Sequence, residues 1–172
     1  MPRAPFPDLE FRPLESTDRE RLAAAFARLS PQSRYQRFPT AKPKLLAGEL
    51  DELTQLDHVT RDAVVAVVRR TDRLVGVARY GSHGGDDSAA DVAVTIADDW
   101  QGRGLGLKLT CMLLDRAARH GIARVTATVL DGNARSRALL RRLGFRARGR
   151  DGNVLEFGLE LRPTIAVAPI RP

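Results

Sequence analysis

The stretch from Val92 to Leu107 constrains the fold of this chain more than any other part of it. A β-branched alternating run ends at Ile96, and three glycines then alternate with other residues before a helical apolar pattern begins. This order is typical of a strand that turns through a glycine loop into a helix. Glycines let a ligand approach the main chain, and a helix start presents unsatisfied N–H groups and a positive dipole end. The segment predicts an anion-binding loop, to which Arg103 adds charge; a glycine turn without any ligand is the alternative.

Hydrophobic periodicity predicts further strands and helices around this unit. Strands are expected at 9–14, 63–68, 74–80, 91–96 and 123–130, with two more around 150–153, the last ending near 161. Helices are expected after the capping residues 16–18, after Ser30 and Pro31, and at 44–56, 105–120 and 133–143. Residues 82–88 are expected to form an exposed loop. The prediction is one mixed α/β domain at 1–161 and a proline-containing tail at 162–172.

Two of these helices carry specific expectations about their faces. The helix at 105–120 is expected to bury Leu107, Cys111, Leu114 and Ala118. The helix at 133–143 is expected to bury Ser136, Leu139, Leu140 and Leu143 and to turn Arg135, Arg137, Arg141 and Arg142 outward.

Composition excludes several classes of protein. The chain has 172 residues and one cysteine, so an internal disulfide framework is excluded and a reducing, cytoplasmic location is expected. Three scattered histidines offer no metal-ligand spacing, so no metal is expected. No run is long and apolar enough for a membrane span or a secretory signal. The net charge of +7 comes almost wholly from arginine, which suits a phosphate ligand but is equally explained by genomic codon bias. Sparse aromatics argue against nucleic acid.

Two common phosphate loops do not match the glycine segment. A Walker loop requires Gly-Lys-Ser/Thr, which is missing here. A dinucleotide fingerprint requires a glycine where Leu109 stands. That fingerprint also follows an early strand, whereas the glycine segment of this chain lies in the middle of the sequence.

A third motif matches better. Residues 101–106 read Gln-Gly-Arg-Gly-Leu-Gly and resemble motif A of the GNAT-type N-acetyltransferase superfamily, Q/R-x-x-G-x-G/A. Residues 133–145 resemble the second signature of that family, with asparagine first, a small residue at +3, leucine at +6 and a glycine-aromatic pair at +11. The resemblance implies a GNAT-like α/β fold: a mixed, largely antiparallel sheet with flanking helices and a central parallel strand pair splayed for acetyl-CoA.

The same resemblance implies which residues hold acetyl-CoA as acyl donor. Main-chain groups of the strand would bind the pantetheine arm, those of the glycine loop the pyrophosphate, and the second signature the other side of the arm. The implied cofactor-binding residues are Val94, Thr95, Ile96, Gln101, Gly102, Arg103, Gly104, Leu105, Gly106, Leu107, Asn133 and Ser136. At about 3.3 Å per residue, the strand from Asp91 to Ile96 spans about 17 Å, comparable to an extended pantetheine.

A narrower resemblance points to the acceptor. Residues 29–38, 53–57 and 75–80 are similar to bacterial protein lysine acetyltransferases of the Pat type, which acetylate a lysine of acyl-CoA synthetases. An amine must lose a proton before it attacks a thioester, so a general base is needed. The base of those relatives is a glutamate whose position matches Asp91, which is one methylene shorter. Asp57, Asp86 and Asp87 are weaker candidates.

The resemblance leaves the acceptor and the leaving-group acid open. The expected acceptor is a protein lysine, for example of an acyl-CoA synthetase, and the alternatives are a small amine or a weakly catalytic acyl-CoA-binding module. Many GNAT enzymes have a tyrosine as acid where Leu140 stands here. A thiolate leaves without such help, because thiols ionise near pH 8.5. Cys111 is expected to be part of the core rather than a nucleophile.

Overall fold

One mixed sheet organises the chain. The computed structural model describes residues 6–38, 43–83 and 86–161, so the tail expected at 162–172 lies outside the described residues. The strands are β1 Leu9–Pro13, β2 Arg61–Val68, β3 Arg73–His83, β4 Asp86–Ile96, β5 Arg124–Leu130, β6 Arg146–Asp151 and β7 Val154–Glu160. The helices are α1 Arg19–Ala27, α2 Pro31–Arg37, α3 Ala47–Thr54, α4 Leu105–Arg119 and α5 Ala134–Arg142, with short 3-10 turns η1 Ser16–Asp18 and η2 Asp98–Trp100.

Strand order confirms the expected sheet. The order is β1-β2-β3-β4-β5-β7-β6. Neighbours pair antiparallel except β4 and β5, which are parallel and joined through α4. A parallel pair needs a crossover of this kind, whereas hairpins suffice for the others.

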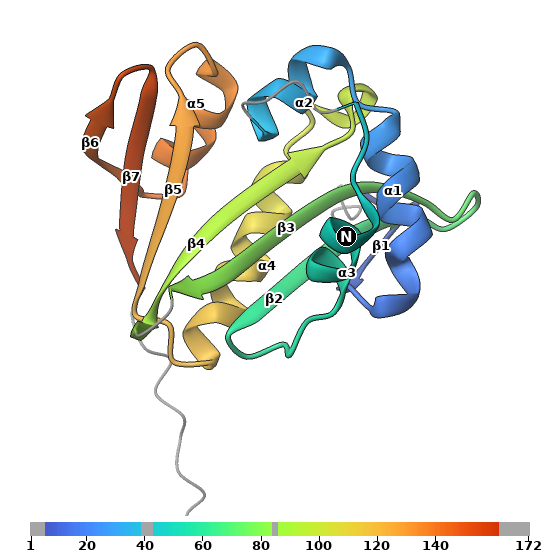
Figure 1. Ribbon diagram of the computed structural model, residues 1–172, viewed down its shortest axis with the longest axis horizontal. Coiled ribbons are helices and arrows are strands. Elements are labelled where there is room, and N and C mark those ends of the chain that lie inside the picture. The colour runs from blue at the N-terminus through green and yellow to red at the C-terminus, as the bar shows by residue number, and fades with distance from the viewer. Residues whose placement is uncertain (1–5, 39–42, 84–85, 162–172) are drawn as a thin grey trace, which may run out of the picture.

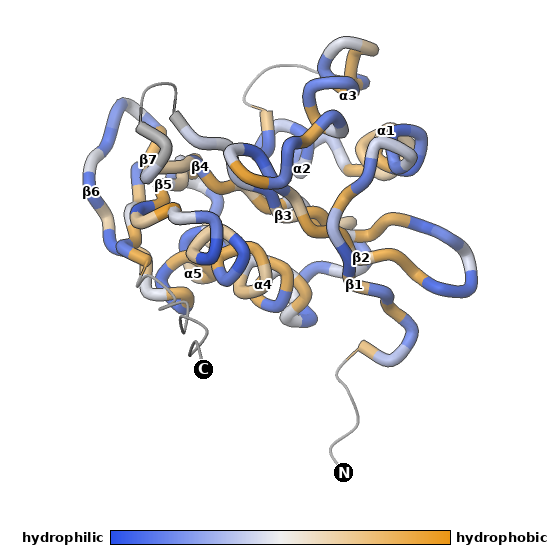
Figure 2. Tube along the Cα trace, turned by 90° about the horizontal axis from the view of Figure 1, so that it is seen from below, coloured by the Kyte–Doolittle hydropathy of each residue, from blue (hydrophilic) through white to orange (hydrophobic). Residues whose placement is uncertain are grey.

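Helices cover both faces of the sheet (Figures 1 and 2). On one face α4 and α5 pack over a core that includes Leu109, Leu113 and Leu140. On the other face α1 and α3 cover a second core that includes Phe26 and Leu50. Strand β2 contributes to both cores, because its side chains alternate between the faces and six consecutive residues of it are buried.

Local capping fixes where two functional helices begin. Ser30 Oγ accepts a hydrogen bond from the backbone N–H of Ser33 at 3.2 Å, with Pro31 in the first turn of α2. Asn133 Oδ1 accepts one from the N–H of Ser136 at 3.1 Å and so starts α5. Each side chain satisfies an N–H that the helix itself leaves without a partner.

The loop expected at 82–88 is wrong at 82–83 and 86–88, while residues 84 and 85 lie outside the described residues. Strand β3 runs to His83 and β4 begins at Asp86, with Ser82 opposite Ala90 and His83 opposite Asp86 across a register shift. Polar and small residues predicted a loop, but ladder hydrogen bonds use only main-chain groups and continue past them. As a result Asp91 lies within β4 rather than at its start.

The expected inner face of α4 is also wrong in part. Leu105, Leu109, Leu113 and Ala117 form the buried stripe; Leu114 is buried as well, Leu107 and Ala118 are half-buried, and Cys111 is exposed. The cause lies in β3, where Gly76 leaves room for the helix. A Cβ at Gly76 would stand 2.7 Å from Leu109 Cδ1. The face of α4 that carries Leu109 therefore packs on β3 at the space that Gly76 leaves.

The faces of α5 differ from expectation too. Leu140 is fully buried, whereas Ser136, Leu139 and Leu143 are half-buried. Arg135 and Arg142 do not simply face solvent but line the cleft described below. Arg137 donates to the carboxylate and carbonyl oxygens of Asp131.

Candidate functional site

The parallel strand pair opens into a cleft. Pairing between β4 and β5 is limited to Ala89–Asp91 against Arg124–Thr126. Beyond Asp91 the two strands diverge, as Figure 1 shows, with β5 continuing beside β7 and β4 beside β3. The splayed pair that the sequence predicted is therefore present, and Asp91 marks the closed end of the opening.

Two adjoining cavities occupy this opening. One of about 400 Å³ lies between the glycine loop, α2 and α5, and one of about 150 Å³ lies deeper between β4 and β5. A volume of this size is in the range of small-molecule sites. Ten of the predicted cofactor residues line them: Val94, Thr95, Ile96, Gln101, Gly102, Gly104, Gly106, Leu107, Asn133 and Ser136.

The other two predicted cofactor residues point their side chains elsewhere. The guanidinium carbon of Arg103 lies 5.2 Å from the centroid of the Trp100 ring, a cation–π contact at the rim of the cleft. The side chain of Leu105 is in the core at 1% exposure. Only its main-chain N–H remains available for a ligand.

The glycine loop has the backbone of an anion cradle. Gly102 and Gly104 adopt φ values of +74° and +84°, which other residues adopt only with strain. No protein atom beyond the chain neighbours lies within 4 Å of where a Cβ would stand at either glycine, so the loop is open to a ligand. Gly104 is the N-cap of the 15-residue α4. The first N–H groups of α4 therefore lie at the end of the helix that borders the cavity.

Polar side chains hold α2 and α5 against this loop. Gln101 Nε2 donates to Ser33 Oγ at 3.2 Å and to the Ile96 carbonyl at 3.1 Å, while Arg135 donates to Gln101 Oε1 at 2.7 Å. Asp98 accepts hydrogen bonds from the N–H and hydroxyl of Ser30 and from the hydroxyl of Ser33. Burial alone would raise the pKa of Asp98, but these hydrogen bonds outweigh it and lower that pKa.

Sequence reasoning missed several cleft residues. Ser33, Gln36 and Arg37 of α2 and Arg135 and Arg142 of α5 line the cavities. The two α5 arginines lie seven residues apart, two turns along one helical face, next to Leu139. That spacing was a readable signal, but nothing in the sequence around 33–37 indicated that α2 would cross the cleft.

Asp91 and the weaker base candidates lie in different settings. Asp91 is exposed, and its Oδ1 accepts a hydrogen bond from the Thr126 hydroxyl across the parallel pair. Asp57 instead organises its own loop, where hydrogen bonds from the Thr60 hydroxyl and three backbone N–H groups hold its pKa far below the usual range. The side chains of Asp86 and Asp87 lie outside the described residues.

Within residues 6–38, 43–83 and 86–161, no group of three or more histidine, cysteine or acidic residues is placed to hold a metal ion. No helix of that part of the chain is long and apolar enough to cross a membrane.

Fold and cleft together define a class: an α/β protein that holds an elongated, phosphate-bearing ligand between two splayed parallel strands. Comparison with known proteins narrows the class. A family model described as an acetyltransferase (GNAT) domain matches residues 8–146. The chain therefore belongs to the GNAT family and is an acetyl-CoA-dependent N-acetyltransferase.

Individual relatives agree. An acetyltransferase of Pseudomonas aeruginosa is 37% identical over 136 residues, which are 78% of this chain and 73% of that protein. Acetyltransferase Pat of Mycolicibacterium smegmatis is 31% identical over 133 residues, 77% of this chain but only 40% of Pat. The GNAT domain of S. lividans PAT has a TM-score of 0.84 at 27% identity and covers 89% of this chain and 90% of that chain.

The cleft fits the acetyl-CoA that this family uses. The polar end of the cleft is lined by the glycine loop, the start of α4, and the side chains of Arg135 and Arg142. Main-chain N–H groups and guanidinium groups together form a donor set suited to phosphates. The deeper part of the cleft runs along Val92 and Val94 on one side and Ala127 and Val129 on the other, an apolar channel for an extended arm.

Proposed function

We propose that this enzyme acetylates a lysine side chain of a protein, with Asp91 as general base, and that residues 1–161 form its single catalytic domain. The position of Asp91 carries the proposal, because it is the last β4 residue paired with β5 before the cleft opens. Likeness to Pat supports a protein acceptor, although the chain spans less than half of that relative.

Cofactor binding would use three parts of the cleft. The N–H groups from Gln101 to Leu107 and the side chains of Arg135 and Arg142 would hold the phosphates. Main-chain groups of Val94, Thr95 and Ile96 on the free edge of β4 would bind the arm, and Asn133 and Ser136 would contact it from α5. Bound in this way, acetyl-CoA supplies the activated acetyl group.

Asp91 would prepare the acceptor. A lysine with a pKa near 10.4 is almost wholly protonated at neutral pH, so the amine must lose a proton to a group within hydrogen-bond reach or one water away. The Thr126 hydroxyl donates to Oδ1 of Asp91 and so orients the carboxylate that would receive that proton. Asp91 is exposed, so a bridging water has access where the shorter side chain does not reach.

A tyrosine acid has no counterpart in this site. Leu140 is buried at 5% exposure and lines the deeper cavity, where it gives the arm an apolar wall. Cys111 is exposed on the outer side of α4 and does not line either cavity of the cleft. The placement of Cys111 favours direct transfer from thioester to amine over a covalent acetyl-cysteine.

The test separates three functions in one experiment. The protein is incubated with acetyl-CoA and either an acyl-CoA synthetase or a small amine such as spermidine, and acetylation is read by mass spectrometry. Acetylated synthetase lysines support the proposal, and acetylated spermidine with unmodified lysines supports the small-amine alternative. An Asp91→Glu variant, which restores the carboxylate of Pat relatives, should retain activity. A rise in melting temperature with acetyl-CoA, without any acetylated product, would support the third function, an acyl-CoA-binding module.

A further inference from the structure

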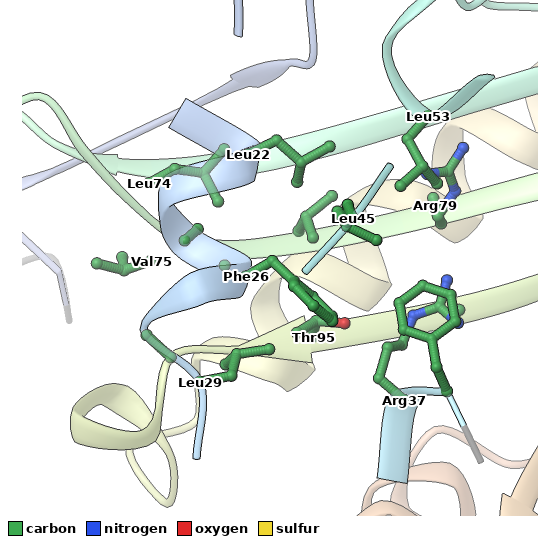
Figure 3. Close-up of a pocket in the computed structure, with 16 residues that line it drawn as sticks. Leu22, Phe26, Leu29, Arg37, Leu45, Leu53, Leu74, Val75, Arg79 and Thr95 are labelled. Atoms are coloured by element: carbon green, nitrogen blue, oxygen red, sulfur yellow. The ribbon is translucent and has the colours of Figure 1, made fainter. Parts of the chain in front are cut away.

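Two arginines meet at one end of a small apolar cavity on the other face of β4. Arg37 is the last residue of α2, and Arg79 lies in the middle of β3. Both line a cavity of about 50 Å³ whose walls are mainly apolar side chains of α1, of the segments next to α2 and α3, and of β3 and β4. Figure 3 shows the two arginines together at the end of the cavity that lies away from Leu74 and Val75.

Neither guanidinium has an anionic partner among the residues that the structure describes. Within the described part of the chain, no hydrogen bond or ion pair reaches the side chain of Arg37 or Arg79; Arg37 only stacks over the Phe38 ring at 4.4 Å. Both are half-buried. Burial lowers the pKa of both, and the charges of Arg37 and Arg61 lower the pKa of Arg79 further, to about 10.

Other arginines at the edges of the cores are paired. Arg12 makes a two-pronged contact with the buried Asp18, at 2.6 and 2.7 Å, and Arg116 Nε lies 2.6 Å from the buried Asp62. Placing two cations beside apolar walls without a carboxylate is unfavourable, since charge removed from water needs a counter-charge. The arrangement therefore suits an anion that arrives with a ligand, and a guanidinium pair fits a carboxylate especially well.

The arginine pair lies on the acceptor side of the site. Arg79 stands opposite Ala93 in the β3–β4 ladder, and Gly81 stands opposite Asp91, so Arg79 and Asp91 are diagonal neighbours on one face. Such neighbours are about 7–8 Å apart. Arg37 also lines both cavities of the cofactor cleft, whereas Arg79 lines neither. An anion between these arginines would therefore lie near Asp91, whereas the glycine loop follows the other end of β4.

We infer that Arg37 and Arg79 bind a carboxylate of the acceptor, close to the amine that is acetylated. The inference rests on the proposed role of Asp91 and narrows the acceptor to amines that carry a nearby carboxylate. Two sources have this chemistry: the α-carboxylate of a free amino acid, and an acidic side chain next to the target lysine of a protein.

Matched acceptor pairs test the inference. Leucine, glutamate and lysine are each compared with the corresponding carboxamide, and a peptide capped at both ends with glutamate on each side of lysine is compared with its glutamine counterpart. The KM of the carboxylate form should be lower by about tenfold or more, the value of a charge-assisted contact. For the amino acids the carboxamide is a strict control, because its amine is less basic and is more often unprotonated. Amine protonation alone would therefore favour the carboxamide over the carboxylate. A preference for the carboxylate form among the amino acids identifies an α-carboxylate as the ligand, and the same preference among the peptides identifies an acidic side chain.

Variants separate this role from a structural one. Arg37→Gln and Arg79→Gln should remove the preference by raising the KM of the carboxylate form much more than the KM of the neutral form. Because each variant removes an uncompensated charge, its melting temperature without ligand should equal or exceed that of the unchanged protein. Arg70→Gln, at an exposed position in the β2–β3 turn, removes the same charge elsewhere and should keep the preference. Equal KM values within every pair, or a preference that survives both variants, would overturn the inference.

Calorimetry distinguishes failure of this inference from failure of the proposed function. The same acceptors are titrated into the protein loaded with coenzyme A, which requires no turnover. Tighter binding of the carboxylate forms that is lost in Arg79→Gln supports the site even if no amine is acetylated, an outcome that would reject only the proposed activity. Acetylation of amines without any carboxylate preference in rate or binding would reject only the arginine site.

Discussion

Replacing Gly104 by alanine isolates what the glycine loop contributes. Gly104 has φ of +84°, and a Cβ added there would meet no other atom within 4 Å. The folded state therefore gains no clash, and the cost is the left-handed backbone, about 1 kcal/mol for alanine. For a chain of this length that cost lowers the melting temperature by about 2–4 °C.

Gly121 provides the matched control. It ends α4 at the opposite end from the cleft, with φ of +85° and the same open surroundings. Gly121→Ala should therefore lower the melting temperature without ligand by the same amount as Gly104→Ala.

Acetyl-CoA should separate the two variants. At a concentration of about 100 Kd a ligand stabilises the folded state by about 2.7 kcal/mol. If the new methyl group in the phosphate cradle weakens binding about tenfold, Gly104→Ala retains only about 1.4 kcal/mol of this, a further deficit of about 3–5 °C. Scanning fluorimetry with and without acetyl-CoA measures both effects. Equal ligand-induced shifts in the two variants would refute the assignment of the loop as the phosphate site.

Three further outcomes follow from the packing and the carboxylates. Gly76→Ala should destabilise the fold by about 1–3 kcal/mol in urea denaturation, since its Cβ would stand 2.7 Å from Leu109 Cδ1; an unchanged midpoint would show that α4 does not rest on β3 there. Asp98→Ala should reduce the free energy of acetyl-CoA binding, measured by calorimetry, more than it reduces the free energy of unfolding, because the hydrogen bonds of Asp98 to Ser30 hold α2 over the cleft. An unchanged affinity for acetyl-CoA would contradict this role of Asp98. The lowered pKa of Asp57, caused first by the Thr60 hydroxyl, gives stability that is complete above about pH 4 and is lost as the pH falls further. Unfolding free energies of Asp57→Asn should accordingly depend less on pH below about 4 than those of the unchanged protein, and parallel curves would contradict this.

Much of the fold was readable because local patterns agreed with long-range pairing. The β-branched run at 63–68 became the buried strand β2, and Ser30 with Pro31 began a helix as expected. The parallel pair followed from one strand–helix–strand unit, since α4 links β4 to β5. These features depend on neighbours in sequence, which is why they were predictable.

Errors arose where a distant element decided the outcome. Two apolar stripes of α4 were available, and the gap at Gly76 on β3 selected the one with Leu109. Polar residues at 82–88 predicted a loop, yet main-chain pairing with the partner strand extended the hairpin. Arg37 and Arg79 are 42 positions apart in the chain, and only the three-dimensional fold brings them to one cavity.

The central claim is that the cleft binds acetyl-CoA and that Asp91 takes the proton from the acceptor. It is tested most directly by the single-turnover rate of acetyl transfer in Asp91→Asn at saturating acetyl-CoA, with the Kd for acetyl-CoA measured on the same sample. Loss of a general base should slow transfer by about 10²–10⁴-fold while that Kd stays within about twofold. A transfer rate equal to that of the unchanged protein would contradict the account.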